Sequence, residues 1–137
     1  MILFYSSHCL EETSIIRILK NQLLSLTIDI NTHETQRFPV DGNAIIFNRI
    51  FTMFNNLQYL NFGPSSTCDE ELFFCWTRPT VISANLLELH VCLTTFYDCL
   101  YLLDGHFNQL RTLYVDVNVI NFMDRRKVNN TVNYFFN

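Results

Sequence analysis

The chain has 137 residues, of which 49% are hydrophobic and 16% are charged. This length fits a single domain, and this composition excludes intrinsic disorder, which needs low hydrophobicity and a high net charge. The formal net charge of -4 argues against a protein that binds nucleic acid mainly through phosphates, because that mode needs a basic surface. No stretch approaches the roughly 20 apolar residues that span a bilayer, so we expect no membrane segment.

The cysteines indicate the redox environment of the chain. There are five, an odd number at wide spacings, which favours reduced thiols in an intracellular protein, cytoplasmic or nuclear. The apolar start, Met1 to Tyr5, is short and has no basic flank, so we expect no secretory signal. The cysteines also lack the short C-x₂₋₄-C spacing of zinc sites, and we predict no metal and no cofactor.

One short phrase occurs four times along the chain: Leu, two residues, Leu, one residue, then a large apolar residue. An asparagine precedes each copy and a small polar residue follows it. Successive copies lie about 24 to 34 residues apart, and a fixed short period is typical of repeat proteins. The phrase is the core of a leucine-rich repeat. The four copies are Leu23-Leu26-Ile28, Leu57-Leu60-Phe62, Leu86-Leu89-Val91 and Leu110-Leu113-Val115.

The phrase predicts the fold class. We expect an α/β leucine-rich-repeat solenoid, a short horseshoe of about four irregular repeats, with parallel strands on the concave side and helices on the convex side. The alternative is an ordinary α/β domain whose parallel strands have similar sequences. Residues 1–137 form a single domain in either case. We expect a short helix over residues 15–21 and two longer helices. The first of these spans residues 44–54 and is capped by Asn43, and the second begins with a capping box of Thr95 and Asp98 and ends at Gly105.

Three further segments carry predictions, and two of them leave alternatives open. The apolar stripe of the second helix is expected to contain Phe96, Cys99, Leu100, Leu103 and Phe107, at steps of three and four residues. The apolar run from Leu72 to Trp76 forms either a short extra strand or a hydrophobic flap. The apolar C-terminus, Tyr134 to Asn137, means that a further repeat has been lost or that the tail folds back onto the last repeat.

At the level of whole segments the sequence resembles the leucine-rich-repeat region of F-box-type proteins. The segments that carry the resemblance are Ile50 to Ser66 (IFTMFNNLQYLNFGPSS) and Asp98 to Val117 (DCLYLLDGHFNQLRTLYVDV). In that family an N-terminal F-box binds the adaptor of a cullin-type ubiquitin ligase, and the repeats present a substrate for ubiquitylation. The Leu-Pro start of an F-box is missing here. The resemblance therefore implies a substrate-recognition segment that is a fragment of a longer repeat array.

The residues between the motif leucines are expected to line the concave surface, where solenoids usually bind. We predict a non-catalytic protein-binding face that contains no Lys or Arg and favours a basic or polar partner. Tyr59 and Tyr114 are its candidate anchors. In three rows, the face contains Ser25, Tyr59, Glu88 and Thr112; Thr27, Asn61, His90 and Tyr114; and Asp29, Gly63, Cys92 and Asp116.

Two other functions stay open. His90, Cys92 and Asp116 could serve a Cys/His-dependent enzyme, because a cysteine nucleophile needs a base and an orienting acid. Residues i and i+2 of a strand lie ~6.7 Å apart at Cα, however, which opposes a hydrogen bond between His90 and Cys92. The other alternative is a truncated remnant with no partner. Uncapped solenoid ends would also lead the chain to self-associate.

Overall fold

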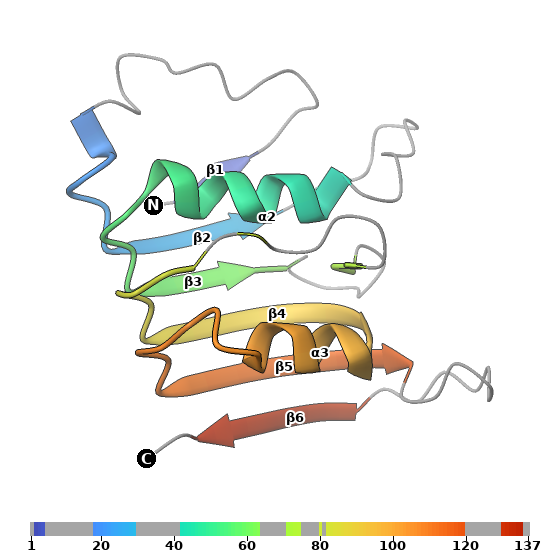
Figure 1. Cartoon of the computed structure of the whole chain (residues 1–137). Coiled ribbons are helices and arrows are strands. Elements are labelled where there is room, and N and C mark those ends of the chain that lie inside the picture. The colour runs from blue at the N-terminus through green and yellow to red at the C-terminus, as the bar shows by residue number, and fades with distance from the viewer. Residues whose placement is uncertain are drawn as a thin grey trace.

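The computed structural model describes residues 2–4, 18–29, 42–63, 71–74, 80, 82–119 and 130–135. Figure 1 shows a sheet with helices packed on one of its faces. The helices are α2 (Gly42–Met53) and α3 (Phe96–Leu103), and Ile18 and Leu19 are helical as well. The strands are β1 (Ile2–Phe4), β2 (Ser25–Asp29), β3 (Tyr59–Phe62), β4 (Glu88–Thr95), β5 (Thr112–Val119) and β6 (Asn130–Phe135).

The strands lie in the sheet in the order in which they occur in the sequence. Strands β2 to β5 form a four-stranded, all-parallel sheet. Strand β1 joins it in parallel beside β2, and β6 returns antiparallel beside β5. The predicted α/β class with parallel strands is therefore confirmed. The C-terminal tail folds back onto the last motif strand, which is the second of the two outcomes expected for it.

The second leucine of each motif copy occupies the same position in its strand. Leu26 pairs with Leu60, Leu60 with Leu89 and Leu89 with Leu113, and the side chains of all four have 0% exposure. The last apolar residues of the copies are in register and buried as well. Alternate residues of a strand point to opposite faces, so the motif selects one face of the sheet for the core. These last apolar residues are Ile28, Phe62, Val91 and Val115.

Helix α2 covers this apolar face with an aromatic side chain at its centre. The ring of Phe47 lies 5.5 Å from that of Phe62 in β3 and 5.8 Å from that of Phe74, measured between centroids. The predicted helix 44–54 is present, but it begins at Gly42, so Asn43 lies in its first turn and is not the N-cap. Oδ1 of Asn43 accepts no hydrogen bond among the described residues, which agrees with this correction.

Helix α3 begins with the predicted capping box, in which the Thr95 hydroxyl accepts from the Asp98 amide and the Asp98 carboxylate accepts from the Thr95 amide. Gly105 follows the helix with a φ of 76°, the left-handed conformation that glycine adopts at no steric cost. The predicted apolar stripe is partly wrong: Cys99 and Phe107 are buried, whereas the rest of it is exposed. Helix α3 has apolar residues on every side, so the spacing of these residues alone does not select the face that is buried.

The irregular segment after β3 supplies a strand-like contact. Leu72 forms an isolated parallel bridge with Leu93. The amide of Leu72 donates to the Cys92 carbonyl at 2.9 Å, and the amide of Thr94 donates to the Leu72 carbonyl at 3.0 Å. Leu72 thus takes the place beside β4 that β3 leaves open when it ends at Phe62. This single bridge favours the strand alternative at Leu72, although no strand forms at residues 71–74, and Cys75 and Trp76 lie outside the described residues.

Candidate functional site

The first two predicted rows of side chains run straight across the sheet. Ser25, Tyr59, Glu88 and Thr112 are paired from strand to strand. Thr27, Asn61, His90 and Tyr114 form the second row in the same way. These residues alternate with the buried motif residues, so they lie on the face opposite the helices (Figure 1). We call these eight residues, together with Asp116, the polar sheet face.

The third predicted row is only partly formed. Cys92 and Asp116 are paired between β4 and β5. Gly63 lies beyond the end of β3, and Asp29 is paired with Phe4 of β1. The row is interrupted because β3 is shorter than β4 and Leu72 occupies the vacated position.

Cys92 was expected to line the exposed face, and this is wrong. Its side chain is only 6% exposed, and Val91 and Leu93 on either side of it are buried too. Three consecutive buried residues mean that both faces of β4 are covered at this point. Cys92 therefore points to the same side of the sheet as His90 but is covered there, so we leave it out of the polar sheet face.

Three rings from three neighbouring strands lie together on the polar sheet face. The rings of His90 and Tyr114 are stacked, with centroids 4.2 Å apart and an interplanar angle of 24°. The ring of Tyr59 lies on the other side of His90, with centroids 5.3 Å apart and an angle of 49°. Aromatic pairs at such distances attract each other beyond the burial of their area. The register thus assembles an aromatic platform, Tyr59, His90 and Tyr114.

A carboxylate borders this platform. Nε2 of His90 lies 2.7 Å from Oε1 of Glu88, two residues earlier on the same strand. The side chains of His90 and Glu88 are 28% and 38% exposed. Side chains at i and i+2 must lean toward each other to make this contact, because their Cα atoms are ~6.7 Å apart. His90 leans toward Glu88, so this nitrogen is directed away from the Cys92 position that the enzyme alternative requires.

The formal charges on the polar sheet face have one sign. Glu88 and Asp116 are its acidic residues, and Asp116 is half-buried. None of the nine residues is Lys or Arg. Asp29 of the predicted face lies in β2, and only its backbone pairing is described. The face therefore combines aromatic rings, small polar side chains and negative charge.

A second polar centre lies inside the molecule, at the start of α3. Oδ1 of Asp98 accepts from the Phe74 amide at 2.9 Å, and Oδ2 accepts from the Thr95 amide at 2.9 Å and its hydroxyl at 2.6 Å. Asp98 is buried. Burial, together with the negative charge of Asp98, raises the pKa of the neighbouring Cys99 thiol above its ordinary value. The sequence predicts the capping box but carries no signal for the bond to Phe74.

The asparagines that precede the motif copies connect successive turns of the chain. Nδ2 of Asn56 donates to the Asn21 carbonyl at 2.9 Å, and Nδ2 of Asn85 donates to the Asn55 carbonyl at 2.8 Å. Before the second and third copies the asparagine thus has a structural role, since each of these two amides satisfies a backbone carbonyl just before the preceding copy.

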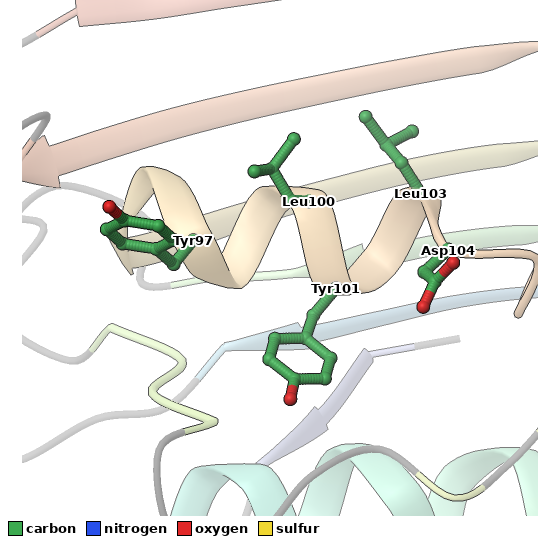
Figure 2. A pocket seen from close by; sticks show the side chains of 5 residues that line it. All are labelled: Tyr97, Leu100, Tyr101, Leu103 and Asp104. Carbon is green, nitrogen blue, oxygen red and sulfur yellow. The ribbon is translucent and has the colours of Figure 1, made fainter.

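The outer side of α3 forms a shallow groove of about 550 Å³ (Figure 2). Tyr97 and Leu100 are 65% and 47% exposed. Leu100 and Leu103 point to one side of the helix and Tyr101 points to the other. The predicted stripe placed Leu100 and Leu103 in the core, so sequence reasoning missed this surface. The groove is lined by Tyr97, Leu100, Tyr101, Leu103 and Asp104.

Comparison of the chain with protein-family models, curated proteins and solved structures finds no match. Within the part of the chain that the structure describes, no helix is long and apolar enough to cross a membrane. The same residues contain no group of three or more His, Cys, Asp or Glu side chains that could hold a metal ion.

Proposed function

We propose that this chain is a non-catalytic protein-binding module and that the polar sheet face is its binding surface. The observation that carries the proposal is the aromatic platform on a sheet face that bears no helix among the described residues. Tyrosine is enriched among residues that dominate binding energy, because it buries a large area at small entropic cost. Half-exposed rings beside a carboxylate match this kind of anchor.

We further propose that the four motif copies are repeats of a short leucine-rich-repeat solenoid, with the sheet on its concave side. The support is the repeated hydrogen bonding just before the strands. The amide of Gln58 donates to the Leu24 carbonyl, that of Leu87 to the Gln58 carbonyl and that of Arg111 to the Leu87 carbonyl. Equivalent residues of successive copies thus make equivalent bonds, as nearest-neighbour stacking of repeats requires.

The specific form of the proposal follows the resemblance to F-box-type proteins. In this form the chain is the substrate-recognition segment of an intracellular ubiquitin-ligase subunit, and the partner is the substrate. Recruitment of the ligase needs an F-box, for which residues 1–137 show no motif. The negative face favours a substrate surface with basic or polar groups.

Site-specific photocrosslinking tests the binding proposal. A benzophenone amino acid at Asn61, in the second row of the face, should give a discrete crosslinked protein in cells. The same group at Arg49, which is exposed on α2, should not give it. The Tyr59→Ala/Tyr114→Ala double variant should abolish the Asn61 product. Equal products from both positions, or a product that survives the double variant, would contradict the proposed surface.

A further inference from the structure

The aromatic platform lies beside a carboxylate on one side of the sheet. His90 lies between Tyr59 and Tyr114, and Oε1 of Glu88 contacts its Nε2. All four side chains are half-exposed. Helices α2 and α3 pack on the opposite face (Figure 1). The platform therefore lies on the side of the sheet away from α2 and α3.

The chemistry of this arrangement selects a cation. Aromatic rings attract cations through their quadrupole, and a carboxylate both attracts a cation and accepts charge-assisted hydrogen bonds. The charged residues of the polar sheet face, Glu88 and Asp116, are both acidic. An anionic ligand would meet like charge without a basic side chain from the face to compensate it.

Among protein cations, arginine fits the platform better than lysine. The guanidinium group is planar, stacks on aromatic faces and donates several hydrogen bonds in one plane. The ammonium group of lysine is a strongly hydrated point charge that cannot stack. The rings of His90 and Tyr114 are stacked on each other, so a guanidinium group would pack on a ring face that this stack leaves uncovered.

We infer that the polar sheet face recognises an arginine side chain of its partner, which packs against the Tyr59-His90-Tyr114 platform and donates to Glu88. This inference rests on the proposed function and names the chemistry of the partner at that surface. Asn61, in the row of His90, and Thr112, in the row of Glu88, border the platform with neutral polar groups. The polar sheet face would therefore select its partner mainly through one guanidinium group of that partner.

The test is an NMR titration of the full chain with three capped pentapeptides: Gly-Arg-Gly-Arg-Gly and the versions with Lys or Glu in place of Arg. The arginine peptide should shift the amide signals of Tyr59, Glu88, His90 and Tyr114. Glu88→Gln should weaken its binding roughly tenfold, since a bond to a charged group is lost. Tyr114→Leu should weaken binding about fivefold through loss of the ring face. Asp104→Asn on α3 is the matched control and should leave binding unchanged.

Equal binding of the lysine or glutamate peptide would overturn the inference, as would shifts confined to α3. Thermal melts of each variant separate loss of binding from loss of folding. A failure of the arginine inference can be told apart from a failure of the protein-binding proposal. If the Asn61 crosslink persists in Glu88→Gln at wild-type yield, the face binds protein without reading arginine. If no Asn61 crosslink forms at all, the protein-binding proposal itself fails.

Discussion

The carboxylate of Asp98 joins two segments that are distant in the sequence. It accepts from the amide and hydroxyl of Thr95, which start α3, and from the amide of Phe74, which follows the Leu72 bridge. All of these groups are buried or half-buried, so water cannot replace the carboxylate cheaply. Asp98 therefore fixes the start of α3 and the path of residues 71–74 at the same time.

Replacing Asp98 by Ala should lower the free energy of unfolding by roughly 2–4 kcal/mol, because buried donors lose a charged acceptor. Asp104→Ala is the control, since this exposed residue follows the other end of α3, and it should change stability by less than about 0.5 kcal/mol. Urea unfolding of both variants measures the difference. A similar small effect for the two would mean that Asp98 does not anchor the segment.

The effect of Cys99 on the stability of the chain should depend on pH in a predictable direction. Burial, and then the charge of Asp98, raises the pKa of its thiol above 9.0, so the folded chain retains a proton that the unfolded chain loses. Stability should therefore fall as the pH rises above about 9, and this fall should be smaller in Cys99→Ala. Parallel urea titrations of the two chains at several pH values between neutrality and the onset of alkaline unfolding test this. Identical pH dependence would refute it.

At the scale of elements, the strands are related by one register in which the motif leucines stack. Leu89 lies between Leu60 and Leu113 and has no exposed surface. On the opposite face of the same strand, His90 stacks with Tyr114 and contacts Glu88. One strand thus contributes to the core with one set of side chains and to the candidate site with the other, as the alternation of a strand dictates.

Leu89→Ala should cost ~2–5 kcal/mol of stability, the range for truncation of a buried leucine. Thr112→Ala, in the neighbouring strand on the polar sheet face, should cost less than about 1 kcal/mol. Chemical denaturation gives both values from the same assay. A cost below about 1 kcal/mol for Leu89→Ala would be the size of a surface effect and would remove this residue from the core.

At the scale of the whole molecule, two features favour association between copies. Strands β1 and β6 lie at the two edges of the described sheet, and edge strands offer unpaired backbone groups to another chain. Helix α3 adds apolar surface on its outer side, where Tyr97 and Leu100 are exposed. The antiparallel return of β6 covers β5, the last strand that carries the motif.

We predict that the isolated chain self-associates with rising concentration. Sedimentation velocity near physiological salt should show species larger than the monomer. The double variant Tyr97→Lys/Leu100→Lys removes the two most exposed apolar side chains of α3, so weaker association in it would assign a part of the association to this surface. A monomer at every concentration of the unaltered chain would show that neither feature drives association.

The sequence alone determined the arrangement of the four parallel strands that carry the motif, β2 to β5. The repeated Leu-x-x-Leu-x-Φ phrase predicted which residues align, and the structure pairs Leu26, Leu60, Leu89 and Leu113 accordingly. It also predicted the first two rows of the candidate face and the capping box of α3. These features depend on residues within one motif or one helical turn, where periodicity and local hydrogen bonding decide the conformation.

Only the tertiary structure decided the remaining features, because each depends on a neighbour distant in the sequence. Cys92 is buried, and the third row is interrupted, where β3 ends and Leu72 pairs with β4. Strand β1 was not predicted, since Ile2–Phe4 carries no motif and becomes a strand by pairing with β2. The exposed side of α3 is set by packing, which spacing cannot specify in a helix that is apolar on every side. The platform exists because three strands bring Tyr59, His90 and Tyr114 together.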